Sequence, residues 1–243
     1  MAVNYTIRVN EVSNKDSNVK AYATVTFGES LAVRNIAIVQ KRDSEELFVS
    51  MPSHRTNEVT ERGEPVFRDI CNPITKEFYE ELTGNIISAY NNRKDLPGGE
   101  LAVGDEKQSK RISYNIKVSP VTREDSSLCG MGRMYIDDCF VINNIRILNG
   151  KNGLFVSLPD YRTEKLRDGK PVYRELVFPV TKEFREELYG KIEKTYNEES
   201  VKKDIEQIRQ AEKRESEKKP AKSSKEKMDL DVPPEPARVG KTR

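Results

Sequence analysis

The hydrophobic pattern near the amino terminus has a period of two residues, as in half-buried β-strands. Residues 5–12 alternate between polar and apolar side chains, and residues 19–27 do so more clearly. The apolar face of the second segment consists of Val19, Ala21, Ala23, Val25 and Phe27. Because a polar turn at residues 14–18 separates the segments, the pattern predicts two antiparallel strands.

A third predicted strand, residues 31–39, changes the phase of its apolar positions midway. Leu31 and Val33 precede the change, and Ile36 and Ile38 follow it. Such a change moves side chains from one face of a sheet to the other, which requires a bulge or a bend. Residues 140–147 repeat the pattern. We therefore expect bulges at Arg34–Asn35 and Asn143–Asn144.

The following segment occurs twice, as LFVSMPSHRT at residues 47–56 and LFVSLPDYRT at residues 154–163, with seven of ten positions identical. A second pair of matching segments, residues 65–91 and 171–197, aligns without a gap. The period of about 105–110 residues is that of a whole small domain and not of a solenoid repeat. The chain therefore contains two copies of one structural unit.

Turn residues and prolines divide the rest of each copy into short elements. We assign both LFVS segments to strands of the core, and in the second copy Asn149–Gly153 favours a tight hairpin before this strand. A polar loop then leads into a short strand, which the pairs Asn72–Pro73 and Phe178–Pro179 are expected to break. The predicted loops are residues 53–64 and 160–170, and the predicted short strands are residues 66–70 and 172–177.

A helix is predicted at the end of each copy, with Thr75 and Thr181 as N-caps. Apolar side chains recur every four residues, which gives each helix one stripe for packing on a sheet. These side chains are Phe78, Leu82, Ile86 and Tyr90 in the first helix and Phe184, Leu188, Ile192 and Tyr196 in the second. Because glycine disfavours helices, we expect Gly84 and Gly190 to mark close backbone packing.

The fold class is therefore α+β, with a small antiparallel sheet and a packed C-terminal helix in each copy. Residues 1–91 form the first predicted domain and residues 112–197 the second. Residues 92–111, which contain Pro97-Gly98-Gly99, are expected to be a flexible linker. Residues 198–243 are predicted to be a charged tail that is partly helical and then disordered.

Charge and composition restrict the function only weakly. After residue 197 there are 13 Lys or Arg against 11 Asp or Glu, which leaves 29 against 29 for residues 1–197. A neutral folded part gives no support from net charge to nucleic-acid binding. No segment approaches the roughly 18 apolar residues of a membrane span, and the amino terminus lacks a signal-peptide pattern. We expect a soluble, cytoplasmic protein without a membrane partner.

A catalytic centre is not expected. His54 is the only histidine, and no serine or cysteine motif or glycine-rich phosphate loop accompanies it. The three cysteines, Cys71, Cys129 and Cys139, have neither zinc-site spacing nor a complete disulfide set. We therefore predict no catalytic residue, no metal site and no cofactor.

The order of the predicted elements around NGKNGLFVSLP resembles the SpoVG family, the stage V sporulation and septation regulators of bacteria. The likeness covers most of residues 5–91 and again residues 114–197, and residues 149–163 are its most specific part. Typical members have one domain, form dimers, and bind DNA and RNA at selected sites. The resemblance implies that the two copies form an intramolecular pseudo-dimer that regulates septation, sporulation or gene expression.

Arginines at equivalent positions of the two copies are the first candidates for contacts with DNA or RNA, because a guanidinium group matches phosphates and base edges. They are Arg55, Arg68, Arg162 and Arg174. The candidates in basic turns and loops are Lys41, Arg42, Lys151, Lys165 and Arg167. His54 and Tyr161, which differ between the copies, can stack on an unpaired base. Alternatively, one or more of the four arginines pair with Asp69, Glu175 or loop carbonyls and hold the shape of the loop.

Two functions of different classes fit these features. The first is a site-selective regulator that binds nucleic acid through loop arginines and basic turns, at two unequal half-sites. The second is a protein-interaction module with reduced nucleic-acid binding, which acts through paired sheets and the charged tail. The acidic peptide at residues 228–234 is then a candidate contact with a protein partner, and pairing between chains would produce further self-association.

Overall fold

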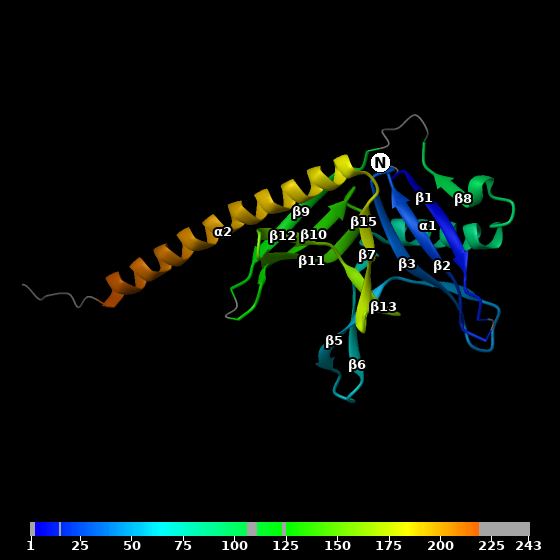
Figure 1. The fold of residues 1–243 in the computed structure, drawn as a ribbon, viewed down its shortest axis with the longest axis horizontal. Coiled ribbons are helices and arrows are strands. Elements are labelled where there is room, and N and C mark those ends of the chain that lie inside the picture. Colours follow the sequence, from blue (N-terminus) through cyan, green and yellow to red (C-terminus); the bar gives the residue numbers. More distant parts are fainter. Residues whose placement is uncertain (1–2, 15, 106–110, 123–124, 219–243) are drawn as a thin grey trace, which may run out of the picture. The chain divides into compact units, whose positions relative to one another are not determined.

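Both copies of the repeat contain the same elements in the same order (Figure 1). The structure, a computed structural model, describes residues 3–14, 16–105, 111–122 and 125–218. The strands of the first copy are β1 (Tyr5–Glu11), β2 (Val19–Phe27), β3 (Leu31–Gln40), β4 (Leu47–Ser50), β5 (Ser53–Val59), β6 (Pro65–Asp69) and β7 (Cys71–Pro73). The strands of the second copy are β9 (Tyr114–Pro120), β10 (Leu128–Ile136), β11 (Phe140–Gly150), β12 (Gly153–Ser157), β13 (Asp160–Arg167), β14 (Lys170–Glu175) and β15 (Val177–Pro179).

The strands form two antiparallel sheets and two separate hairpins, which confirms the predicted α+β class. The first sheet has the order β15-β3-β2-β1-β8, with β4 also paired to β3, and the second has the order β12-β11-β10-β9, with β7 also paired to β11. The helices are α1 (Lys76–Asn91) and α2 (Lys182–Lys218), and a short helix η1 (Pro97–Gly99) precedes the strand β8 (Glu100–Val103).

The third strand of each copy contains its predicted bulge. Asn35 and Asn144 have left-handed backbone, with φ of 62° and 59°, and the strand register shifts at these points. Each bulge separates two halves that pair with different strands. In β3 the half before the bulge pairs with β15 and the half after it pairs with β4. In β11 the corresponding partners are β7 and β12.

The strands β7 and β15 are exchanged between the copies. Strand β15 belongs to the second copy but pairs with β3 of the first, while β7 of the first copy pairs with β11 of the second. Backbone hydrogen bonds extend the exchange: Arg34 N donates to Leu176 O at 2.9 Å and Asn143 N to Ile70 O at 2.7 Å. The expectation that the prolines break these segments was wrong. Proline lacks an N–H group, but it is tolerated here because it ends each strand.

One buried cluster joins the hydrophobic cores of the two copies. Phe140 of the second copy is fully buried, and its ring centroid lies 4.9 Å from that of Phe27 in the first copy. The ring of Phe78 on α1 meets Phe140 edge-on at 6.4 Å. Aromatic pairs in such tilted or edge-on geometry stabilise a core beyond the area that they bury. The two copies therefore share packing as well as strands.

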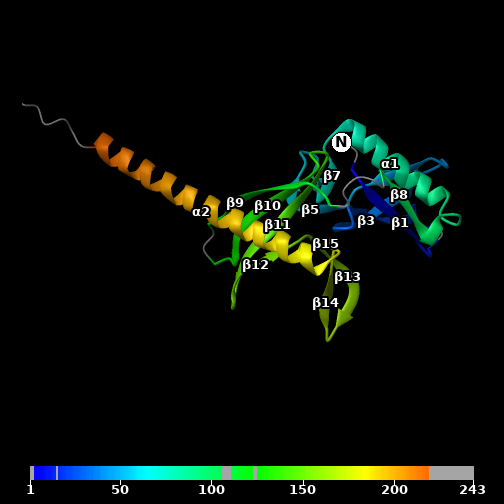
Figure 2. The same cartoon turned by 90° about the horizontal axis from the view of Figure 1, so that it is seen from above.

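Each helix begins at its predicted cap and packs on one sheet (Figure 2). Thr75 Oγ1 accepts a hydrogen bond from Phe78 N, and Thr181 Oγ1 accepts one from Phe184 N, both at 3.2 Å. The buried helix side chains are Phe78, Leu82, Ile86 and Ala89 in α1 and Leu188 and Ile192 in α2. Among the described residues, no helix is both long and apolar enough to cross a membrane. The acidic peptide at residues 228–234 lies outside the described residues.

Two expectations about the strands need correction. In the LFVS segments only Val49 and Val156 are buried, whereas Phe48 and Phe155 are 46% and 48% exposed. Side chains alternate across a sheet, so each phenylalanine points away from the face that holds the valine. Residues 92–111 are not simply a flexible linker, because β8 pairs with β1 and Glu100 forms an ion pair with Arg8 at 2.6 Å.

The predicted close packing at the helix glycines is also wrong. A Cβ atom added to Gly84 or Gly190 would meet nothing within 4 Å. Since alanine is favoured over glycine in a helix interior by about 0.5–1 kcal/mol, Gly84→Ala is expected to raise the free energy of unfolding by about that amount. Urea denaturation monitored by circular dichroism measures the change.

Gly104 provides the opposite control. Its backbone φ is +116°, and a Cβ atom there would overlap the side chain of Asn4. Gly104→Ala is therefore expected to lower the free energy of unfolding. An unchanged or lowered stability of Gly84→Ala would contradict the prediction that helix propensity decides the effect at this position.

Candidate nucleic-acid interface

The segments predicted as arginine-bearing loops are exposed β-hairpins. Strands β5 and β6 pair to form the first hairpin, and β13 and β14 pair to form the second (Figures 1 and 2). Neither hairpin is hydrogen-bonded as a strand to either sheet. The loop prediction was wrong because these segments are polar on both faces, so they lack the alternation that identifies a half-buried strand.

Strand register places the leading arginine of each hairpin beside an exposed aromatic ring. Arg55 is directly opposite Phe67, and Arg162 is directly opposite Tyr173. Residues that face each other across antiparallel strands share one face, so each pair presents a cation and a ring together. Phe67 is 59% exposed and Tyr173 is 58% exposed. In the part of the chain that the structure describes, the guanidinium groups of Arg55 and Arg162 have no ion-pair or hydrogen-bond partner.

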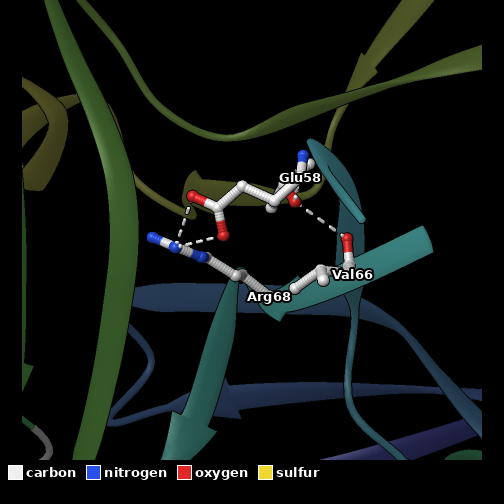
Figure 3. A network of polar contacts seen from close by, with 4 residues as sticks. Glu58, Val66 and Arg68 are labelled. Carbon is white, nitrogen blue, oxygen red and sulfur yellow. Dashed lines mark hydrogen bonds and ion pairs between the residues drawn. The ribbon is translucent and has the colours of Figure 1, made fainter. Parts of the chain in front are cut away.

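Arg68 faces the other side of the first hairpin and is held by a carboxylate. Its Nη2 donates to both oxygens of Glu58 at 2.8 Å (Figure 3). Thr56 braces the same strand pair, because its Oγ1 accepts from Glu58 N and donates to Val66 O at 3.2 and 3.0 Å. The ion pair is exposed, so its contribution to stability is at most about 1 kcal/mol. Nevertheless, the guanidinium group of Arg68 is already paired within its own hairpin.

The second hairpin lacks this ion pair and is more basic. Lys165 stands where the first hairpin has Glu58, and Arg174 has no partner within the described residues. Residues 160–175 contain five Lys or Arg against four Asp or Glu, whereas residues 53–69 contain three against four. Lys165 and Arg167 both lie on β13 and are exposed. The two hairpins are therefore electrostatically unequal.

His54 and Tyr161, the candidates for base stacking, occupy the inner ends of the hairpins. His54 Nδ1 lies 3.1 Å from Asn144 Nδ2, so the first hairpin is joined to the bulge of β11. Tyr161 is partly buried against the core. Neither ring is as exposed as Phe67 or Tyr173.

The remaining basic candidates lie on turns of the two sheets and not on the hairpins. Lys41 and Arg42 follow β3, and Lys41 forms an exposed ion pair with Glu46 at 3.3 Å. Lys151 lies in the tight turn between β11 and β12, where the register confirms the hairpin expected at Asn149–Gly153. The second hairpin thus carries four of the basic candidates, namely Arg162, Lys165, Arg167 and Arg174. Lys41, Arg42 and Lys151 lie on neither hairpin.

Sequence reasoning missed Phe67 and Tyr173. Both stand immediately before an arginine that was singled out, in the matching segments VFR and VYR. Their exposure could not be deduced, since an apolar side chain in a strand usually faces a core.

The cysteines remain free thiols, and burial raises the pKa of the Cys139 thiol to about 12. Within the described ranges, no group of three or more His, Cys, Asp or Glu side chains is arranged to hold a metal ion.

Comparison with known proteins accounts for the repeat. The family model SpoVG matches residues 1–92 and, separately, residues 112–198. A relative from Treponema denticola is 33% identical over 97 residues, covering 40% of this chain and 95% of the relative. Relatives from Macrococcus caseolyticus and Phytoplasma australiense are 35% and 32% identical over 74 and 84 residues. These alignments cover 30% and 35% of this chain and 60% and 81% of the relatives.

Each of these relatives is named "Putative septation protein SpoVG". The Treponema relative is matched almost completely by an alignment about as long as one copy of the repeat. Most of such a relative therefore corresponds to one half of the present chain. Because the family model covers both halves, the chain belongs to the SpoVG family and carries two copies of its domain.

Proposed function

We propose that this protein is a regulatory protein that binds DNA or RNA through its two β-hairpins. The observation that carries the proposal is the repeated pair of an unpartnered arginine and an exposed aromatic ring, Arg55 with Phe67 and Arg162 with Tyr173. Arginine binds phosphates and guanine edges, and an aromatic face stacks on bases. The names of the relatives extend the proposal to a regulator of septation or sporulation.

Charge supports unequal contributions from the two hairpins. The second hairpin has free Arg162 and Arg174 and a lysine at position 165, whereas in the first hairpin Arg68 is bound to Glu58. Removing a phosphate-contacting cation weakens binding at all sequences and reduces its salt dependence. We therefore expect a larger loss of affinity from Arg162→Ala than from Arg55→Ala.

The test is fluorescence anisotropy of labelled DNA and RNA fragments titrated with the full chain at several salt concentrations. Binding is expected to weaken with salt, and replacing Arg55 and Arg162 together is expected to lower the slope of log affinity against log salt by about two. The matched control replaces Lys76 and Lys182 by alanine. These exposed lysines also lie at equivalent positions, and each lies near a glutamate one helical turn away.

Two results would contradict the proposal. One is the absence of any salt-dependent binding by the unmodified chain. The other is an identical slope for the Arg55/Arg162 double variant and the lysine control, because the hairpins would then contribute no more than any other pair of charges.

A second candidate function is a protein-interaction module, favoured by Phe48 and Phe155. Both rings are about half exposed, and they lie on β4 and β12, which end their sheets. Exposed aromatic rings on edge strands suit a protein partner that extends the sheet. A partner that the full chain captures without nucleic acid, and that the variant with both phenylalanines changed to serine does not capture, would favour this function over the first.

A further inference from the structure

A polar groove of about 820 Å³ lies between the first hairpin and the second sheet. Its floor is formed by β9, β10 and β11 of the second copy, and one wall is formed by β5 and β6 of the first copy. The residues that matter for its chemistry are His54, Lys117, Arg133, Tyr135, Asn143 and Asn144. The groove therefore exists only because both copies contribute to it.

The floor is the face of the second sheet opposite helix α2. On the helix side, Tyr114 meets Phe184 at 5.5 Å, and a side chain at Gly130 would contact the ring of Tyr196. Successive side chains of a strand alternate between the faces. Lys117 is three positions after Tyr114 on β9, and Arg133 is three positions after Gly130 on β10. Both side chains consequently lie on the face away from α2.

The floor presents an aromatic ring beside two cations that face each other on neighbouring strands. Tyr135 is half-buried, and Lys117 Nζ lies 5.2 Å from its ring centroid. Arg133 is directly opposite Lys117 on the neighbouring strand and is exposed. In the described part of the chain neither Lys117 nor Arg133 has a carboxylate partner. Neither charge is neutralised by a carboxylate there, so both can bind the phosphates of a ligand that lies beside the ring.

Donors and acceptors of hydrogen bonds lie where the wall meets β11 of the floor. Asn144 Nδ2 lies 3.1 Å from His54 Nδ1, and Asn143 Nδ2 donates to Asp69 O at 3.2 Å. These contacts fasten the hairpin to the second sheet beside the bulge at Asn144. The carboxylates of Glu58 and Asp69 also line the groove, and Arg68 neutralises the first. The groove consequently offers acceptors as well as donors, which distinguishes it from a simple anion site.

From this arrangement we infer that the groove binds an unpaired nucleotide of a single-stranded segment of DNA or RNA. The base stacks on Tyr135 and meets the amide and carboxylate groups where the wall joins β11, while Lys117 and Arg133 bind its phosphates. The inference rests on the proposed nucleic-acid function and adds a substrate class to it. A single strand is expected here and not a duplex, because the bases of a duplex are stacked on one another and offer no free face to Tyr135.

The counterpart face of the first copy lacks these groups. Arg8 stands in place of Lys117 but is paired with Glu100 of β8, and Thr24 and Thr26 stand in place of Arg133 and Tyr135. Thus the fold is duplicated but this chemistry is not. We expect one single-strand site in each chain, in contrast to the two hairpins.

The test compares a labelled single-stranded oligonucleotide with a duplex of the same sequence, by anisotropy on the full chain. The variant Arg133→Thr with Tyr135→Thr gives the second copy the residues of the first. It is expected to lower affinity for the single strand about tenfold while leaving duplex affinity unchanged. The matched control is Tyr22→Thr, at an exposed tyrosine on β2 of the first copy. The single variant Tyr135→Phe, which retains the stacking face, is expected to keep most of the single-strand affinity of the unmodified chain.

Equal single-strand affinity of the double variant and the unmodified chain would overturn the groove site while leaving the proposed function intact. A parallel loss for the single strand and the duplex would also overturn it. Failure of the unmodified chain to bind either nucleic acid would instead refute the proposed function itself.

Photochemical crosslinking on the unmodified chain keeps the test decisive if the double variant fails to fold. An oligonucleotide that carries 5-iodouridine is irradiated with the protein, and the attachment site is mapped by mass spectrometry. Attachment at Tyr135 or the neighbouring groove residue Met131 supports the site. Attachment exclusively on the hairpin rings Phe67 and Tyr173 would overturn it.

Discussion

Replacing Phe140 by alanine is expected to lower the free energy of unfolding by about 3–5 kcal/mol. The side chain comes from the second copy but lies against Phe27 and Phe78 of the first, and it is fully buried. Its removal leaves a cavity in the cluster that joins the two cores. Because that cluster is continuous, both copies are expected to lose stability together, in a single unfolding transition.

Urea denaturation followed by circular dichroism and by tyrosine fluorescence measures this effect. Phe155→Ala is the matched control, since Phe155 lies on β12 of the same copy and is 48% exposed. Its replacement is expected to change the stability by about 0.5 kcal/mol or less. Two separate transitions in the Phe140→Ala protein, or a loss below about 1 kcal/mol, would mean that the copies do not depend on each other's cores.

A fragment of residues 1–105 is expected to form a dimer, whereas the full chain is expected to be a monomer of 27.8 kDa. The fragment retains β8 but loses β15, so the first half of β3 still pairs with β2 but has no strand on its other side. Its own β7 likewise loses β11. Since β7 and β15 occupy equivalent positions in the two copies, β7 of one fragment can pair with β3 of another.

Sedimentation equilibrium over a range of protein concentrations distinguishes the two states. The mass of the fragment should approach twice its monomer value and fall on dilution, while the mass of the full chain should remain constant, because its exchange occurs within one molecule. A folded, monomeric fragment would refute the dependence of β3 on β15. A dimeric full chain would show that the strands are exchanged between chains.

Local signals in the sequence were sufficient for most elements. The phase change at Arg34–Asn35 predicted the bulge because one extra residue reverses the faces of a strand. Thr75 was identifiable as a cap, and Asn149–Gly153 as a hairpin, because both signals depend on adjacent residues. The motif at residues 149–163 indicated the family and the repeat indicated two copies of its domain, and the family match to both halves of the chain confirms both.

Pairings between distant residues could not be predicted in this way. Strands β7 and β15 have three residues each, too few for a periodic pattern, and each lies far in sequence from its partner strand. The contact between His54 and Asn144 crosses 90 positions. The groove therefore has no signature in the sequence. The roles of Arg55, Arg162 and the other basic candidates remain predictions.

One edge of each sheet, at β8 in the first and at β9 in the second, is protected from adding further strands. In the first sheet the edge strand β8 has only four residues, and it covers the longer strand β1, which would otherwise expose a row of unpaired backbone groups. In the second sheet Lys191 Nζ donates to Tyr114 O at 3.0 Å and Lys203 Nζ to Pro120 O at 3.3 Å, so lysines of α2 occupy both ends of β9. Lysine and proline at an edge discourage edge-to-edge aggregation. Helix α2 thus blocks the free edge of β9. A chain that ends before Lys191 would expose this edge, to which the strands of other chains could add.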